Sequence, residues 1–401
     1  MSALDTWGEP VAAANPSSVI AWNDAWIDLL HFQGDPFARL AEANRSDAEF
    51  VLGLVFCVVY RSLAGKPPGF GDVRDELERA ASRVATSRER GHVEAASLLV
   101  GGNFTRAGER WEELASDSHD LAAIRFAHEM YLHVGDAERR LRASTTALAG
   151  WSQEHPNWAF IAGQHSFALE EVGQYAQAEQ VGWQALERDP LDLWALHALA
   201  HVYESTDNQP AALDLLRSRQ PTWTTQDVFS VHIWWHLALR LMVDAEFDEV
   251  LAIHDRLAAT VTTAFHYSDL ASMLWRLELL GVDVGDRWDA VAEAYATLPE
   301  RHTTGFLDLH AALAFARRPD HAEAPIFFAG VAPSHANDPS ENGEIFRTVV
   351  VPMTEAIRLG DTDPRAARGL FTSIGPRLHR IGGSNAQRQV LSLTLEALGA
   401  T

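Results

Sequence analysis

The stretch VGQYAQAEQVGWQALERDP, residues 172–190, decides the fold. It begins with a turn residue, continues with an aromatic residue, and then places small residues at helical spacing before a proline. These positions are Gly173, Tyr175, Ala178, Ala185 and Pro190. Apolar residues three and four apart predict a helix over this stretch, and its small residues allow a neighbouring helix to approach closely.

Four other segments repeat this plan at nearly constant intervals. Each has a turn residue, an aromatic residue or its substitute, a small residue three positions later and an apolar stripe. The aligned residues, spaced by 33, 38, 34 and 38 positions, are Phe104, Ala137, Tyr175, Gln209 and Phe247. A period of about 34 with this pattern is typical of tetratricopeptide repeats, each of which is a helical hairpin. One hairpin cannot bury its apolar face alone, so the sequence predicts stacked hairpins.

The rest of the chain also shows helical periodicity, and no stretch alternates for long enough to predict a strand. We therefore predict an all-α fold, a tetratricopeptide-like helical-repeat solenoid of about twenty helices in antiparallel pairs, coiled into a right-handed superhelix. Residues 1–401 form a single solenoid in this prediction. Divergent N-terminal helical pairs take residues 1–90, the clearest repeats 91–260, and divergent C-terminal pairs 261–401. The proline-containing segment 317–346 is predicted as the clearest long loop region.

Composition and charge exclude several function classes. The chain is 47% hydrophobic, which is typical of a globular protein. Its net charge of −23 argues against a nucleic-acid or membrane partner, because nucleic acids and anionic membranes bind positive surfaces. The single cysteine, Cys57, lies in an apolar run and predicts a core thiol. The N-terminus does not resemble a signal peptide, and the apolar runs are too short to span a bilayer, so we expect a soluble cytoplasmic protein.

Six blocks of the sequence carry a more specific resemblance. They are RERGHVEAASLL (88–99), GQHSFALEEVGQYAQAE (163–179), DPLDLWALHALAHVYE (189–204), HIWWHLAL (232–239), SMLWRLELLGVDVGDRW (272–288) and DLHAALAFA (308–316). Their order and spacing resemble the tetratricopeptide repeat protein 38 family over most of the chain. The resemblance implies an all-helical solenoid in the cytosol and implies no particular reaction. His165 stands where a small or apolar residue is expected.

The first helix of each tetratricopeptide hairpin lines a concave groove, and four of its positions point inward. In the repeat that spans residues 159–192 these positions hold Phe160, Gly163, Phe167 and Glu170. In the next repeat they hold Trp194, His197, His201 and Glu204. We therefore expect a concave, acidic groove lined by histidine and tryptophan, with Gly163 leaving room opposite His197.

The following first helix carries a second histidine pair, His232 and His236, with Trp235 between them. Further candidates on later helices are Asp269, Arg276 and His310. Arg276 is expected either to anchor a ligand carboxylate or to form a salt bridge within the protein. Because neighbouring first helices lie side by side, these side chains could converge with the first histidine pair in one cavity.

These residues allow three functions. The sequence favours a binding protein whose groove holds a small molecule or a peptide segment. The alternatives are an enzyme that uses His201, His236 and Glu204 for acid–base or metal-assisted chemistry, and a scaffold that binds partners on its convex surface. No cofactor is implied, because phosphate-loop and dinucleotide motifs are absent from the sequence. We expect no bound metal; the candidate ligands, if one binds, are His197, His201, His232 and His236. The sequence does not specify an oligomeric state.

Overall fold

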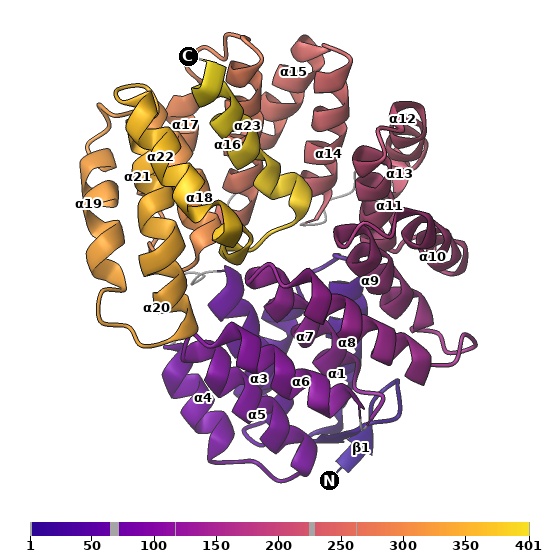
Figure 1. Ribbon diagram of the computed structural model, residues 1–401. Helices are drawn as coiled ribbons and strands as arrows, with labels where there is room; N and C mark the ends of the chain where they lie inside the picture. The colour runs from indigo at the N-terminus through magenta and orange to yellow at the C-terminus, as the bar shows by residue number, and fades with distance from the viewer. Residues whose placement is uncertain (1, 65–71, 117, 224–228, 262, 401) are drawn as a thin grey trace. The chain divides into compact units, whose positions relative to one another are not determined.

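The computed structural model describes residues 2–64, 72–116, 118–223, 229–261 and 263–400 (Figure 1). The chain divides into two compact units. Unit 1 comprises Met1–Leu132 and Ala137–Ser230, and unit 2 comprises His133–Asp136 and Val231–Thr401. Whether the two units form one continuous solenoid stays a prediction.

Unit 1 begins with a short hairpin and continues as helices. Strands β1 (Ser2–Leu4) and β2 (Pro10–Ala12) are antiparallel. These strands were not predicted, because three residues are too few to show an alternating pattern. The helices that follow are α1 (Pro16–Leu30), α2 (Pro36–Ser46), α3 (Val51–Ala64), α4 (Val73–Ala81), α5 (Ser87–Val100), α6 (Phe104–Ser116), α7 (Leu121–His133), α8 (Ala137–Gly150), α9 (Trp158–Glu171), α10 (Tyr175–Arg188), α11 (Leu193–Ser205), α12 (Gln209–Ser218) and α13 (Gln220–Trp223).

Unit 2 contains the remaining helices. They are α14 (Ser230–Val243), α15 (Phe247–Ala258), α16 (Ala264–Leu279), α17 (Arg287–Ala296), α18 (Gly305–Arg317), α19 (Ala324–Ser334), α20 (Glu341–Ile345), the π-helix η1 (Phe346–Val350), α21 (Val351–Leu359), α22 (Pro364–Ile374), the 3₁₀ helix η2 (Gly375–Ile381) and α23 (Asn385–Ala400). The prediction of a long loop over residues 317–346 is wrong, because α19 and α20 lie there. Pro325 occupies the first turn of α19, where a missing N–H removes no helical hydrogen bond.

The helices form the predicted hairpins. The five residues aligned in the sequence are each the first residue of a second helix, namely of α6, α8, α10, α12 and α15. Within unit 1, α9 packs against its hairpin partner α10 and also against α11, the first helix of the next hairpin. This alternation of partners is how stacked hairpins bury the face that a single hairpin leaves open. The predicted tetratricopeptide-like helical-repeat fold is therefore confirmed, and it continues beyond residue 260 in α16 to α19.

Small residues allow α9, α10 and α11 to pack closely. Ala178 and Ala185 of α10 are fully buried. A Cβ atom on Gly182 would lie 2.8 Å from Ser166 Oγ and 2.9 Å from the Leu199 side chain. Ser166 also donates a hydrogen bond of 2.7 Å to the Ala178 carbonyl oxygen, which ties α9 to α10. These helices carry the first group of candidate site residues, so their close packing fixes where those side chains point.

The structure also bears on the sequence predictions for Cys57 and for membrane-spanning segments. Cys57 is buried in α3, and burial raises the pKa of its thiol to about 12, so it is the core thiol that the sequence predicted. Among the described residues, none of the helices is both long and apolar enough to cross a membrane.

Candidate functional site

The predicted groove residues of α9 and α11 are buried. They are Phe160, Phe167, Glu170, Trp194, His197 and His201, and the most exposed of them, Trp194, keeps only 6% of its surface in contact with solvent. Glu204, at the end of α11, is half-buried. These side chains therefore do not line an open groove, which corrects the expectation from the sequence.

The loop between α1 and α2 covers part of this face from within unit 1. His31 Nε2 lies 2.8 Å from Asp189 Oδ2, and the His31 ring also contacts Phe160, with 5.1 Å between ring centroids. The Phe32 ring stacks on Phe229 at 4.2 Å and lies nearly parallel to Trp194 at 6.1 Å. The chain thus places its own imidazole and phenyl rings where the sequence predicted a ligand.

This loop is charged and conformationally strained. The hydrogen bond to Asp189 raises the pKa of His31 above its ordinary value, and His31 Nδ1 lies 3.1 Å from the Ile27 carbonyl oxygen. Because both acceptors need an N–H, the bonded form of the ring is the imidazolium. Phe32 has a φ of 55°, a left-handed conformation that costs a residue with a Cβ about 1–2 kcal/mol.

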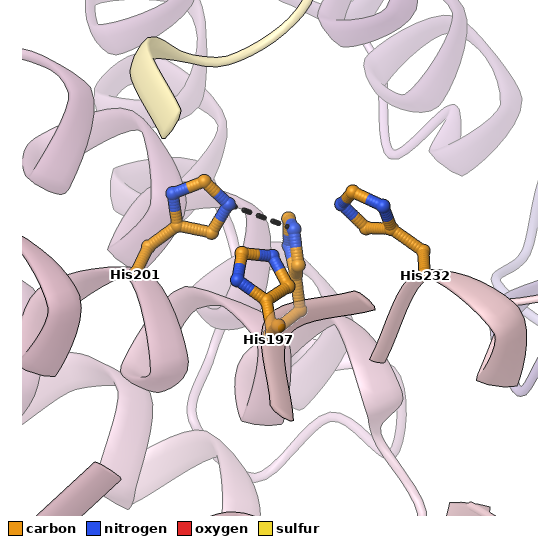
Figure 2. A group of neighbouring side chains, drawn as sticks. His197, His201 and His232 are labelled. Atoms are coloured by element: carbon orange, nitrogen blue, oxygen red, sulfur yellow. Dashed lines mark hydrogen bonds between the residues drawn. The ribbon is translucent and has the colours of Figure 1, made fainter. Parts of the chain in front are cut away.

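We call Glu170, His197 and His201 the His201 cluster. His201 Nε2 and His197 Nε2 are 3.0 Å apart, as the dashed line in Figure 2 marks. On the other side of the ring, His201 Nδ1 lies 3.6 Å from Glu170 Oε2, while Glu170 Oε1 accepts a hydrogen bond of 2.7 Å from Ser205. His232, also drawn in Figure 2, belongs to unit 2. The sequence-based prediction pairs His201 with Glu204. It places Glu170, one hairpin earlier, among the groove residues but does not pair it with His201.

Burial favours the protonated form of Glu170. Burial, assisted by repulsion from Glu171, raises the pKa of Glu170 to about 8 against the opposing effects of Ser205 and Arg140. Arg140 lies 3.2 Å from Glu171 Oε2 and so offsets mainly that neighbouring carboxylate. A carboxyl group that is largely protonated at neutral pH, next to an imidazole, has the composition of an acid–base pair.

Asp192 sets the position of α11 and corrects the expected role of Gly163. Its Oδ1 accepts hydrogen bonds of 2.9 and 3.0 Å from the backbone N–H groups of Trp194 and Ala195, which caps α11. A Cβ atom on Gly163 would lie 2.8 Å from Asp192 Oδ2, so this glycine makes room for the cap and not for a ligand opposite His197. Burial raises the pKa of Asp192 to about 7.

His165, which departs from the tetratricopeptide repeat pattern, has a hydrogen-bond partner in unit 1. Its Nδ1 lies 3.0 Å from Ser144 Oγ, and burial lowers its pKa to about 4. Ser144 also lines a small cavity with His128, Arg140 and Gln164. The cavity offers about 20 Å³ to the centre of a water molecule, which is room for one or two waters and not for an organic ligand.

Unit 2 contains its own buried polar group on α14 and α16. His232 Nδ1 lies 3.0 Å from Asp269 Oδ1, and Trp235 Nε1 donates a hydrogen bond of 3.2 Å to Ser272 Oγ. Arg276 donates to Ser272 Oγ and, at 2.7 Å, to the Ala386 carbonyl oxygen, and its guanidinium lies 5.4 Å from the Trp235 ring centroid. The Arg276 guanidinium therefore has acceptors within the protein.

Two further candidates of unit 2, His236 and His310, are almost fully buried. Burial, reinforced by His232, lowers the pKa of His236 well below its ordinary value. Burial also lowers the pKa of His310 to about 4, and its Nδ1 lies 2.8 Å from the Phe306 carbonyl oxygen. Both rings are neutral at pH 7. That the two histidine pairs share one cavity stays a prediction.

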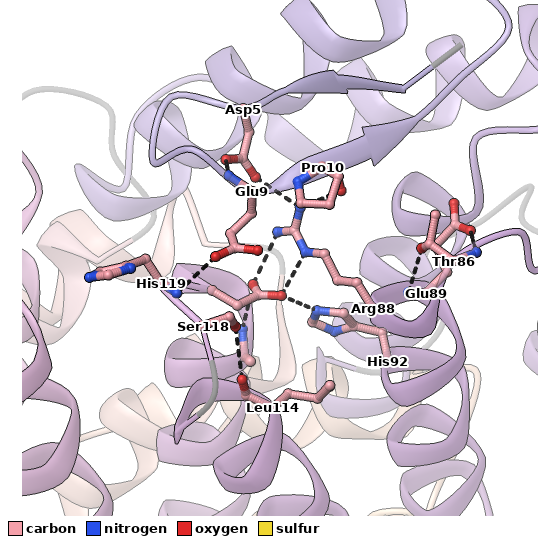
Figure 3. Close-up of polar contacts among 12 residues, drawn as sticks. Asp5, Glu9, Pro10, Thr86, Arg88, Glu89, His92, Leu114, Ser118 and His119 are labelled. Carbon is pink, nitrogen blue, oxygen red and sulfur yellow. Dashed lines mark hydrogen bonds and ion pairs between the residues drawn. The ribbon is translucent and has the colours of Figure 1, made fainter.

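Sequence reasoning missed a second polar group in unit 1, the Arg88 cluster of Asp5, Arg88, His92 and Asp120 (Figure 3). Arg88 binds Asp120 through Nε at 2.7 Å and a terminal nitrogen at 3.1 Å, and it binds Asp5 at 3.0 Å. His92 Nε2 lies 2.8 Å from Asp120 Oδ2. The cluster fastens the N-terminal hairpin to α5 and to the start of α7.

The two carboxylates of the Arg88 cluster differ in pKa. Burial alone would raise the pKa of Asp120, but Arg88 and His92 outweigh it and hold this pKa well below its ordinary range. Burial dominates at Asp5 and raises its pKa to about 6 despite Arg88. One arginine therefore compensates one carboxylate fully and the other only in part.

No protein-family model matches the chain. Solved structures with a similar chain course include a Rap protein complexed with competence and sporulation factor, at 14% identity and a TM-score of 0.46, covering 81% of this chain and 99% of that one. Yeast Tom70 shares 12% identity at a TM-score of 0.38, over 88% of this chain and 91% of that one. The TPR domain of P58(IPK) shares 12% identity at a TM-score of 0.22, over 86% and 90%. The helical-repeat assignment rests on the hairpins themselves.

Proposed function

We propose that the protein is a helical-repeat binding protein and that α9 and α11 of unit 1, with Phe229, hold a peptide segment. The observation that best supports this is the loop after α1, whose His31 and Phe32 already lie on this face. A face that binds part of its own chain through side chains has the chemistry to bind another segment of the same kind.

The contacts of the loop indicate which peptide fits. We call Phe160, Trp194 and Phe229 the aromatic patch; it stacks an aromatic side chain, while Asp189 pairs with a cation. The ligand is therefore a segment with a basic residue next to an aromatic one. The net charge of −23 favours a basic residue over an acidic one at the position next to the aromatic residue. His31 and Phe32 are each only half-buried, so the loop competes with the ligand at the edge of this face.

The test uses a labelled synthetic peptide with the sequence of residues 27–36, IDLLHFQGDP. The double variant H31A/F32A, which vacates the aromatic patch, is expected to bind this peptide at least about 10-fold more tightly than the wild-type chain, because the wild type is mostly self-occupied. Fluorescence anisotropy measures both affinities. Trp194→Ala in the H31A/F32A background removes one of the two rings that lie parallel to Phe32 and should weaken binding at least about 10-fold.

Two controls separate binding from unfolding. Far-UV circular dichroism establishes that each variant keeps its helix content, and a peptide whose phenylalanine is replaced by alanine should bind neither protein. The proposal fails if folded H31A/F32A binds the peptide no better than the wild type does, or if the alanine peptide binds equally well.

The His201 cluster supports a second candidate function, acid–base chemistry on a small molecule. The supporting observation is the 3.6 Å separation of Glu170 Oε2 and His201 Nδ1, with Glu170 protonated near neutral pH. In this alternative His201 and Glu170 exchange the proton, and His236 of unit 2 stays a sequence-based candidate. Native mass spectrometry before and after denaturation should then detect a co-purified small molecule that His201→Ala loses. Absence of such a molecule from the wild type counts against this candidate.

Two finer sequence-based proposals accompany this function. The six blocks quoted above support membership in the tetratricopeptide repeat protein 38 family, and the single buried Cys57 is typical of a protein of the cytoplasm. Alignment of homologues across residues 163–204 and 232–288 tests the first, and localisation of a tagged chain tests the second.

A further inference from the structure

The Nε2 atoms of His197 and His201 point toward each other. Their four-residue spacing on α11 puts both rings on one face of the helix, and their Nε2 atoms are 3.0 Å apart (Figure 2). The rings keep only 3% and 1% of their surface in contact with solvent. Two buried imidazole nitrogens that converge in this way either share one proton or bind one cation.

The separation fits two ligands of one transition-metal ion. Zinc–nitrogen bonds are about 2.0–2.1 Å long, so two nitrogens 3.0 Å apart subtend an angle of about 95° at a shared ion. An opening of a few tenths of an ångström would reach the tetrahedral angle, which side-chain rotation within a rotamer allows. Imidazole is a preferred ligand of Zn²⁺, Cu²⁺ and Ni²⁺.

The surroundings of His201 match those of a metal ligand. Its Nδ1 lies 3.6 Å from Glu170 Oε2. A carboxyl group near the second nitrogen, in its ionised form, is the usual means by which proteins orient a metal-binding imidazole, so such a site requires Glu170 to be ionised when the ion is bound. The Phe167 ring lies 5.1 Å from both histidine rings, and the Trp194 ring lies 5.3 Å from that of His197. These aromatic rings lower the local dielectric constant, which strengthens the attraction between a cation and its ligands.

We propose that His197 Nε2 and His201 Nε2 bind a divalent transition-metal ion, with Glu170 as a positioning residue that orients His201. Chain groups and solvent complete the coordination, since two ligands do not fill a tetrahedral site. The ion takes the place of the proton between the two rings, and that proton moves to His197 Nδ1, so both imidazoles stay neutral. The proposal goes beyond peptide binding at the aromatic patch and does not depend on it.

A different site on the same residues is less favourable. Glu170, Glu171 and His201 offer ligand atoms within 4.8 Å of one another, which would place an ion on the Nδ1 side of His201. However, Arg140 lies 3.2 Å from Glu171 Oε2 and 4.5 Å from the Phe167 ring centroid, so a cation already occupies the neighbourhood of that carboxylate. A second cation there would be repelled by the guanidinium.

The experiment titrates the full chain with Co²⁺ alone after dialysis against a chelator, and it follows the visible absorption of the bound ion. The wild type is expected to bind one Co²⁺ that Zn²⁺ displaces. The double variant H197A/H201A should weaken binding at least about 100-fold, and E170Q should weaken it about 10–100-fold, the range for loss of an orienting partner. His254→Asn, which removes an equally buried histidine of α15, should leave the affinity unchanged.

Further variants keep the outcome decisive. H197Q/H201Q, which retains polar side chains of similar length, replaces H197A/H201A if circular dichroism shows that the alanine variant does not fold. The proposal is overturned if the wild type binds no stoichiometric Co²⁺, or if a folded double variant binds it as tightly as the wild type. It is also overturned if E171Q weakens binding and His197→Ala does not, since that result places the ion on the Nδ1 side of His201.

Discussion

The Arg88 cluster and the His201 cluster are both buried polar groups of unit 1, but they differ in how far their carboxylates are satisfied. Each oxygen of Asp120 accepts two hydrogen bonds, from Arg88 and His92 and from the Ala123 backbone. Glu170 has one short hydrogen bond, from Ser205, and its other oxygen accepts none from the described residues. Equal burial therefore gives an ionised carboxylate in one cluster and a largely protonated one in the other.

This difference separates a group that holds the fold from one that is available for chemistry. A buried charge is tolerated when several donors replace the lost water, and the cluster then resists change. A buried carboxyl group with spare acceptor capacity and a neighbouring imidazole can still take a proton, an ion or a ligand. Hydrogen-bond satisfaction, more than burial, therefore identifies the His201 cluster as the candidate site.

The largest expected effect compares matched amide substitutions in the two clusters. Asp120→Asn leaves Arg88 and His92 buried without their carboxylate and should lower the free energy of unfolding by about 3–5 kcal/mol. Glu170→Gln replaces a largely neutral carboxyl group by a neutral amide of the same shape and should change it by less than about 1 kcal/mol. Urea unfolding at pH 7, followed by circular dichroism, measures both. Equal losses in the two variants would remove the distinction between the clusters.

The hairpins could be predicted from the sequence, because their signals are local. Tyr175 and its aligned counterparts begin second helices, since a turn residue and small residues at helical spacing act within one segment. The loop predicted over residues 317–346 is wrong, because that prediction treats every proline as a helix breaker. Pro325 lies in the first turn of α19, where proline favours a helix, whereas a proline in the middle would break it. The fold could therefore be predicted from the sequence wherever residues close together in the chain determine it.

The candidate site could be predicted only in part, because the residues that meet there are far apart in the sequence. Histidine spacing on α11 predicts that His197 and His201 share a helix face, but nothing local shows that Phe32 would cover Trp194. Arg88 and Asp5 are 83 positions apart, so no periodic pattern joins them. The Glu170–His201 contact joins one hairpin to the next. The repeat register places both residues on the inner face, but it does not show that they would be in contact.

The second prediction concerns pH and the incompletely compensated carboxylate of the Arg88 cluster. The folded-state pKa of Asp5 is about 6 against an ordinary value of 3.8, so the native state binds this proton more tightly than the unfolded state does. Its stabilising contribution is complete below pH 3.8 and is lost as the pH rises through 6. Relative to Asp5→Asn, the wild type should lose about 2–3 kcal/mol of unfolding free energy between pH 4 and pH 7.

Urea unfolding of both proteins at several pH values across this window measures the difference. Asp120 acts in the opposite direction, because its low folded-state pKa gives stability that is lost only as the pH falls below about 4. A constant difference between wild type and Asp5→Asn from pH 4 to pH 7 would contradict partial compensation at Asp5.

The smallest expected change in unfolding free energy comes from removing the N-terminal caps of α5, which carries Arg88 and His92, and of α11, which carries His197 and His201. Thr86 caps α5 in a reciprocal capping box with Glu89, and Thr86→Ala should cost about 1 kcal/mol. Asp192 caps α11 with two hydrogen bonds, yet its Oδ2 is buried and accepts none within the described chain. At pH 8, above its raised pKa of about 7, Asp192→Ala removes the cap and also an uncompensated buried charge, so these effects oppose each other.

Asp192→Ala should therefore lower the free energy of unfolding by no more than Thr86→Ala does at pH 8, although it removes more hydrogen bonds. Urea unfolding measures both losses. A clearly larger loss for Asp192→Ala would mean that the α11 cap is as well compensated as Asp120, and hydrogen-bond satisfaction would then no longer separate the two regions.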